Sequence, residues 1–405
     1  MVLSWLILIF FNILCAVNRH KAILALFPFA LLFTTIPLLE GGHDLLLFSG
    51  LLLSGFAWGV IDGNVKIKDK NPFLPIIVIN LIVTFLVGFF NNSGFKPSFI
   101  IIESAQFLFL IVFWNSINTK EDVHKLLHYF SVLTVFVFAL AVTELIFHKN
   151  IWFEFFQPFF NKVIFHSRIS DIRFGFGRYN SVFDFCVSMG DFFAVMAATY
   201  LFLNINSQRR SHQVLSYRVL LLICLLGVLL ANSRACLVAL LIGLFQFKGI
   251  KNNFWLFLVI GIVAGGFIYS SLQSIFDTSV NYGSSFEMRE AQLQLVLLET
   301  TKHPIFGDLT AVNELQMIDR DAFGLESVVF TKLLNSGIVG FLAYVFTYVS
   351  MFLVFPKKRK YFPFLLSSLW VAAAVMSLTT GLSIVFPIVI LMVVYKMYSF
   401  DLIHS

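Results

Sequence analysis

The chain has 405 residues, of which 59% are hydrophobic and 12% are charged. The core of a soluble domain could not bury so much apolar surface, but a lipid bilayer can, so the composition excludes a soluble protein and predicts an integral membrane protein. The formal net charge is +6. In a membrane protein, an excess of basic residues helps to orient the loops relative to the membrane. We therefore expect no nucleic-acid partner.

Apolar stretches of membrane-spanning length follow one another along the chain. They lie near residues 2–17, 22–39, 44–60, 73–90, 99–117, 126–147, 182–204, 215–232, 235–250, 254–271, 326–355, 361–380 and 382–397. This pattern predicts an all-α, polytopic fold of roughly 12–13 transmembrane helices, forming one membrane domain over residues 1–405. The first stretch lacks the basic start and small-residue cleavage site of a signal peptide, so we expect it to remain as a span.

Basic residues orient these spans. Short Lys-rich loops, which the positive-inside rule places in the cytoplasm, alternate with loops poor in Lys. The basic loops are residues 19–21, 66–70, 120–125, 209–218, 248–251 and 357–360. Two long loops, residues 148–181 and 272–325, are then predicted on the outer face.

Arg234 interrupts an apolar run in which hydropathy alone would place no charge. The tripeptide Asn232-Ser233-Arg234 fits the shared tip of two antiparallel spans at the outer face. A guanidinium at that depth is costly unless an anion meets it.

Arginine is frequent on the predicted outer face, whereas Lys dominates the inner loops. The outer arginines are Arg168, Arg173, Arg178, Arg234, Arg289 and Arg320. The planar guanidinium grips phosphate with two parallel hydrogen bonds, which gives a reason for choosing Arg there. Ordinary ion pairing with loop carboxylates is the alternative.

Both outer loops contain a predicted surface helix. In the second, residues 288–298 read as an amphipathic helix that ends in a Pro/Gly turn at residues 301–308. The first carries an aromatic cluster at residues 152–160. That cluster fits a helix in the headgroup plane, which either anchors the loop or frames lateral access for a polyprenyl chain.

Four motifs in the second half of the chain resemble, in their order, the O-antigen polymerase and O-antigen ligase superfamily of bacterial envelopes. The motifs are Arg173 to Asn180, Ser233-Arg234, an Arg-led helix ending in His-Pro-x-x-Gly (Arg289 to Gly307), and Glu326 eleven positions before a Gly-x-x-Gly helix (Gly337 and Gly340). The resemblance covers roughly residues 165–345. It implies a glycosyltransferase-C-like membrane enzyme, with its active site facing the periplasm from the bacterial inner membrane.

The resemblance also implies a substrate and two possible reactions. Polymerases of this kind join oligosaccharide repeat units carried on undecaprenyl diphosphate, whereas the ligases move the finished chain onto lipid A-core. At the position of Glu326-Ser327 in this chain, the ligases resemble one another in having His-Asn. This difference favours the polymerase. The implied partners are the lipid-linked oligosaccharide, membrane lipid, a chain-length regulator and a flippase.

The chemistry of such a transfer assigns roles to the arginines. The departing diphosphate must be stabilised as the anomeric bond breaks. Arg234 and Arg289 are the first candidates, and Arg173 and Arg178 the next. No cluster of metal-binding carboxylates is apparent in the sequence, so we expect arginine in place of a divalent cation, and neither a metal nor a cofactor.

Glu326 is the candidate base for the proton of the acceptor hydroxyl, because a carboxylate at the mouth of an apolar cavity has its pKa raised by desolvation. A pairing with Arg289 or Arg320, or helix capping together with Ser327, is the structural alternative. Both readings stay open.

Three further polar residues are candidates for the site. His303 could act in acid–base chemistry or at the sugar, although its place before Pro304 also fits a structural hydrogen bond in a turn. Asp184 and Asp191, seven residues apart, could share one helix face and orient an arginine.

Two other functions remain open alternatives to the enzyme. A flippase or other transporter would usually carry internal repeats and charges through the midplane, whereas here no repeat is found and the charges gather on one face. A purely structural membrane subunit would leave the outer arginines unexplained.

Overall fold

The computed structural model describes residues 2–39, 45–65, 71–160, 177–183, 185–206, 215–233, 236–237, 239–240, 285–318, 328–354 and 383–402. Within these ranges, five helical segments are long and apolar enough to cross a membrane, and four shorter apolar helices accompany them. The protein is therefore an α-helical, multi-pass membrane protein, as the composition predicts. The predicted spans 254–271 and 361–380 lie outside the described residues.

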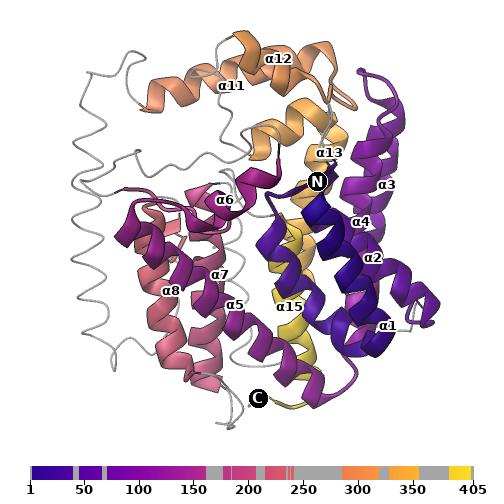
Figure 1. Ribbon diagram of the computed structural model, residues 1–405. Helices are drawn as coiled ribbons and strands as arrows, with labels where there is room; N and C mark the ends of the chain where they lie inside the picture. The colour runs from indigo at the N-terminus through magenta and orange to yellow at the C-terminus, as the bar shows by residue number, and fades with distance from the viewer. Residues whose placement is uncertain are drawn as a thin grey trace.

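The helices follow the predicted apolar stretches closely (Figure 1). The long ones are α1 (Val2–Ala30), α4 (Pro97–Ser116), α5 (Lys120–Phe147), α7 (Cys186–Asn206) and α13 (Val328–Leu353). The shorter apolar ones are α2 (Leu47–Ile61), α3 (Leu74–Phe90), α8 (Tyr217–Ala231) and α15 (Val385–Ser399). The remaining elements are η1 (Leu31–Phe33), β1 (Pro37–Leu39), β2 (Leu45–Leu46), α6 (Ile151–Phe156), η2 (Gln157–Phe159), α11 (Ser285–Lys302) and α12 (Ala311–Ile318).

The first two predicted spans form one kinked helix. α1 breaks at Asn18, whose φ of −149° and ψ of 80° are not helical, so the chain turns at the basic loop as expected. The second span is shorter than the predicted range 22–39. α1 ends at Ala30, the 3-10 turn η1 continues to Phe33, and Pro37, which lacks an N–H and disfavours helix in the residue before it, begins strand β1.

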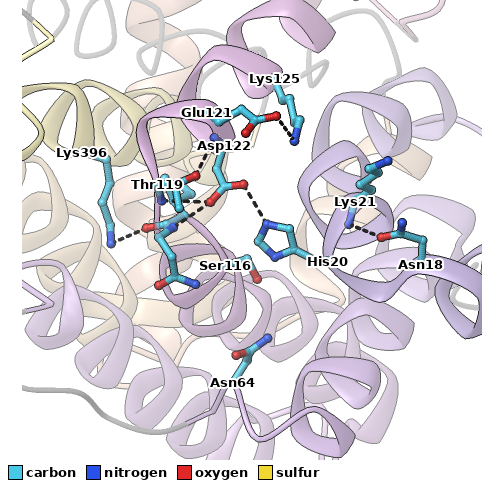
Figure 2. Close-up of polar contacts among 12 residues, drawn as sticks. Asn18, His20, Lys21, Asn64, Ser116, Thr119, Glu121, Asp122, Lys125 and Lys396 are labelled. Carbon is cyan, nitrogen blue, oxygen red and sulfur yellow. Dashed lines mark hydrogen bonds and ion pairs between the residues drawn. The ribbon is translucent and has the colours of Figure 1, made fainter.

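The basic loops 19–21 and 120–125 meet at one end of the bundle, which we call the inner end (Figure 2). His20 Nε2 lies 2.8 Å from Asp122 Oδ1, and Arg19 pairs with Asp62 at 3.4 Å. Lys396 of α15 donates to the Ile117 carbonyl at 2.8 Å. Contacts at this end therefore join the kink of α1, the start of α5 and the end of α15.

The opposite end, which we call the outer end, carries the helices of the predicted outer loops. α11 and α12 lie across it (Figure 1), and α11 covers the predicted amphipathic stretch 288–298. α6 supplies the helix predicted in the aromatic cluster. Its Trp152 packs against Phe33 and Phe136, with ring centroids 6.0 and 5.9 Å apart.

α7 is the most buried of the five long helices. In its most apolar stretch of 18 residues 89% are buried, against 17% for that of α1, whose buried residues lie mainly between Ile23 and Ala30. Tyr200 of α7 shares a buried hydrogen bond of 3.0 Å with Thr134 of α5. Phe192 of α7 packs on Phe386 of α15 with ring centroids 5.6 Å apart. These contacts join α7 to α5 and α15.

Candidate functional site

The segment 177–183, which follows the first arginine motif, is held in a buried polar cluster. Glu144, 1% exposed near the end of α5, accepts hydrogen bonds from the N–H groups of Asn180 and Ser181 at 3.1 and 2.8 Å. The carbonyl of Ser181 accepts from Asn150 at 2.8 Å. Arg178 is 5% exposed, so its guanidinium lies inside the outer end and not in a solvated loop.

This segment packs against the tip that carries the second motif. The N–H of Tyr179 donates to the carbonyl of Leu230 at 3.4 Å. Asn232 ends α8 in the left-handed conformation, φ 49° and ψ 42°, which Asn adopts more readily than most residues. The first two motifs, far apart in sequence, therefore lie side by side.

Ser233 continues this contact into α7. The Cys236 thiol lies 3.1 Å from Asp191 Oδ1 and 3.2 Å from Ser233 Oγ, and both of those residues are 3% exposed. The N–H of Leu237 donates to the Ser233 carbonyl at 3.1 Å, which is helical spacing. A further helical turn thus starts at the tip, and most of the predicted span 235–250 that would follow it lies outside the described residues.

The third and fourth motifs dock on each other. α13 breaks at Gly337, with φ 61° and ψ −163°, and the turn 304–308 fills the break. The Ile338 N–H donates to the Pro304 carbonyl at 2.9 Å, and the Asp308 N–H donates to the Leu334 carbonyl at 2.8 Å. Hydrogen bonds that α13 would make within itself are thus made with the His-Pro-x-x-Gly turn.

Asn91, at the end of α3, ties this docked turn to the bundle. Its side-chain amide donates to the carbonyls of Phe306 and Asn335 at 2.9 and 3.0 Å, and its Oδ1 accepts from Leu309 N at 2.9 Å. Asp308 accepts from Asn92 at 3.0 Å. Burial raises the pKa of this carboxyl, but hydrogen bonds from Asn92 and Thr310 outweigh it and hold the pKa below its usual value.

A cavity of about 390 Å³ lies beside the segment that follows the first motif and beside the start of α13. One wall comes from Phe183, Phe185 and Ser188, just after the Arg178 segment. Another comes from the first turns of α13, which lead to the break at Gly337. The remaining walls are formed by α1 and η1, α2, α4 and the start of α15.

The structure describes only part of the site predicted from the sequence. Arg178 and His303 are described, and Arg289 belongs to α11, where its backbone is helical. The predicted residues outside the described ranges are Arg173, Asp184, Arg234 and Glu326. In the sequence, Asp184 stands between Phe183 and Phe185, Arg234 follows Ser233, and Glu326 precedes Val328 by two positions.

His303 begins the docked turn, where its carbonyl accepts the Gly307 N–H at 3.1 Å. Its imidazole is half-buried, and His303 does not line the cavity. A role for its side chain at the sugar therefore stays a prediction.

Several polar residues of the cavity were not predicted. Lys332 lines it from α13, together with Ser49, Gln106 and Ser383. Lys332 carried a signal in the sequence, because an ionisable residue inside an apolar helix indicates a functional site. The other three are ordinary polar residues of apolar helices, and nothing in the sequence distinguishes them.

Among the residues that the structure describes, no group of three His, Cys, Asp or Glu side chains is arranged to hold a metal ion. Comparisons of the chain with protein-family models, with curated proteins and with solved structures give no match.

Proposed function

We propose that this protein is a polysaccharide polymerase, a metal-independent glycosyltransferase that joins oligosaccharide repeat units carried on undecaprenyl diphosphate. The observation that carries the proposal is that the four motifs pair at the outer end. The Arg178 segment contacts the last turn of α8, which leads to the Ser233 tip, and the His303 turn fills the break in α13. A cavity lies beside them, lined by residues that follow the first motif and by Val328, Thr331 and Lys332 within the fourth.

The proposed reaction takes place at the outer face of the bacterial inner membrane. The acceptor hydroxyl of one lipid-linked unit bonds to the anomeric carbon of the growing chain, and the bond from that carbon to the diphosphate breaks. The lipid diphosphate leaves with the electron pair, stabilised by Arg234 and Arg289 with support from Arg178. The hydroxyl proton passes to Glu326.

Two features favour this proposal over the alternatives. Glu326-Ser327 replaces the His-Asn pair of the ligases, so transfer onto lipid A-core is the weaker candidate. The candidate site residues whose side chains the structure describes, Arg178 and His303, both lie at the outer end, whereas a flippase needs a polar path through the midplane.

The proposal is tested with purified protein and a defined lipid-linked repeat unit, without any lipid A-core. The unaltered protein should form polymer, whereas Arg234→Ala and Arg289→Ala should lower the rate by at least about 100-fold, as expected when a group that stabilises transition-state charge is lost. Lys302→Ala is the matched control, because Lys302 is exposed at the end of α11 and pairs with Glu299. Glu326→Gln should also abolish polymer formation.

Full polymer yield from both arginine variants would rule out the diphosphate role. Normal yield from Glu326→Gln alone would return Glu326 to a structural role. Transport of the lipid-linked unit across vesicles without any bond formation would show a flippase instead.

A further inference from the structure

One side of α3 is an apolar stripe on the outside of the bundle. The stripe consists of Val78, Ile82, Phe85 and Phe89, each between 41% and 56% exposed. These positions recur every three or four residues, which places them on one side of the helix. A groove of about 370 Å³ along the same side is lined by apolar side chains of α3. Because the protein is a multi-pass membrane protein, this stripe faces lipid.

α3 is too short to cross the hydrocarbon layer by itself. It begins at the inner end, where Phe73 packs on Tyr395 of α15 with ring centroids 6.2 Å apart, and it ends at Phe90, beside the docked turn. Its 17 residues span about 25 Å, whereas the hydrocarbon core of a bilayer is about 30 Å thick. The basic loop 66–70 comes just before α3 and is expected among the inner headgroups. The shortfall therefore lies at the outer end, and Phe90 is still at hydrocarbon depth.

Aromatic contacts continue the apolar surface from α3 onto the docked turn. Phe89 stacks on Phe95 of the loop before α4, with ring centroids 5.0 Å apart. Phe90 packs on Phe306 of the docked turn at 5.5 Å. Phe90 and Phe95 are exposed, and so is Ile305, which precedes Phe306. We call these five side chains the outer apolar patch.

Backbone hydrogen bonds hold the patch level with the end of α3. The Asn92 N–H donates to the Gly307 carbonyl of the docked turn at 3.2 Å. The Lys96 N–H donates to the Gly88 carbonyl in the last turn of α3 at 3.0 Å. The docked turn and the loop before α4 therefore lie at the depth at which α3 ends.

Lysines stand next to the patch in the sequence. Lys96 follows Phe95 directly, and the exposed Lys302 precedes Ile305 by three positions. Aromatic rings are enriched where membrane meets water, and Lys near a helix end can extend its ammonium to the headgroups while its stem lies on apolar surface. The composition around the patch is thus that of a membrane–water interface.

We propose that the outer apolar patch is an interfacial anchor that contacts the phospholipids of the outer leaflet. Ile305 and the Phe rings lie among the acyl chains just below the headgroups, which holds the His-Pro-x-x-Gly turn at headgroup depth. The patch takes lipid and not a protein partner, because it continues the lipid-facing stripe of α3 at a depth that the bilayer fills. The inference does not depend on the proposed reaction. It adds a membrane contact to a motif that the sequence places in a loop on the outer face.

Fluorescence quenching on the full-length protein in phospholipid nanodiscs measures the depth of the patch. The native cysteines are buried, so bimane attached to a single introduced cysteine reports on that position. The label of Ile305→Cys should be quenched by phospholipid brominated near the headgroup. It should also be several-fold less accessible to aqueous iodide than the label of Glu314→Cys, an exposed position on α12. Phe85→Cys is the lipid-facing reference, and its label should respond best to bromine deeper in the acyl chain.

Two results would overturn the anchor. Iodide quenching as strong at Ile305 as at Glu314, without an effect of brominated lipid, would show that the docked turn stands in water. Protection of the Ile305 label from both quenchers, while the Phe85 label responds to brominated lipid, would show that protein covers the patch.

Phe95→Cys repeats the measurement outside the docked turn. Phe95 lies in the loop before α4, so its replacement leaves the hydrogen bonds between the turn and α13 in place. Its label should respond to brominated lipid and iodide as the Ile305 label does. Full exposure of the Phe95 label to iodide would contradict the anchor even if Ile305→Cys failed to fold. No turnover is measured, so the anchor and the polymerase proposal can fail separately.

Discussion

Glu144 shows how one buried carboxylate can position a functional segment. Glu144 accepts hydrogen bonds from the backbone N–H groups of residues 180 and 181, which follow Arg178 by two and three positions. The Ser181 hydroxyl adds a bond of 2.8 Å to the Val137 carbonyl, and Ser181 itself has a φ of 54°. α5 thus fixes the direction in which the chain leaves Arg178, although it contributes nothing to the four motifs.

Asp308 makes the docked outer turn sensitive to acid. Its folded-state pKa lies below the ordinary value of 3.8, so its stabilising bonds are fully present above pH 3.8 and are lost as pH falls through the lower, folded-state value. We expect hydrogen–deuterium exchange protection of residues 304–312 to be retained above about pH 3.8 and to fall at lower pH, after correction for intrinsic exchange.

Asp308→Ala should show low protection at pH 7 and little further loss on acidification. Asp62→Ala is the control, because Asp62 pairs with Arg19 at the inner end, and it should retain the normal pH profile in residues 304–312. The same acid response in Asp308→Ala as in the unaltered protein would assign the effect to another group.

At the scale of single residues, the sequence indicates charges better than contacts. Arg178 was predicted as a site residue because it is an arginine on the predicted outer face, away from the Lys-rich loops. Lys332 could have been found in a similar way, because an ionisable residue inside an apolar helix indicates a functional site. Ser49 could not, because its distinguishing property is a missing hydrogen bond. That property exists only after folding.

At the scale of elements, the break in α13 is the feature most specific to this chain. Gly337 combines a φ of 61° with a ψ of −163°, a conformation open essentially to Gly alone, and a Cβ there would overlap the Ile305 carbonyl group. Gly337→Ala should therefore lower the free energy of unfolding by at least about 1–3 kcal/mol. Thermal unfolding in detergent measures this change.

Gly94→Ala separates strain from overlap. Gly94 also has a positive φ, 83°, but no atom lies within 4 Å of the site that a Cβ would occupy. It should cost clearly less than Gly337→Ala and leave the exchange protection of residues 304–308 intact. Equal effects of the two variants would mean that backbone strain, and not the docked turn, decides the stability.

Apolar runs predicted most helices, because the energy of lipid burial follows composition directly. Helix ends were predicted less well. α5 begins at Lys120 and not near residue 126, since Thr119 and Asp122 form a capping box of polar residues that an apolar pattern excludes. The pairing of the four motifs could not be predicted either, because order along the chain does not say which helices are neighbours.

At the scale of the whole molecule, Asp122 joins elements that are distant in sequence (Figure 2). It accepts from the N–H groups of Asn118 and Thr119 at 3.1 and 2.9 Å and from His20 of α1 at 2.8 Å. Asp122→Ala removes the capping box and the link to α1 together. The free energy of unfolding should fall by about 1–2 kcal/mol or more, mostly from the lost cap.

Glu121→Ala is the neighbouring control. Glu121 is exposed and pairs with Lys125 one turn along α5, so its loss should change the free energy of unfolding much less than the loss of Asp122. Calorimetric unfolding in detergent would compare the two. A larger effect at Glu121 would mean that the inner end is held by surface charge and not by the cap.

The burial of α15 bears on the order in which this protein can assemble during its synthesis. The side chains from Phe386 to Val394 are buried, and the helix packs on α4, α5 and α7. The ribosome makes it after every helix that it touches. Until then the side of Phe192 that packs on Phe386 lacks this partner. More than 380 residues are thus synthesised before α15 can pack against α7. A membrane chaperone that shields α7 during that interval would raise the yield of folded protein.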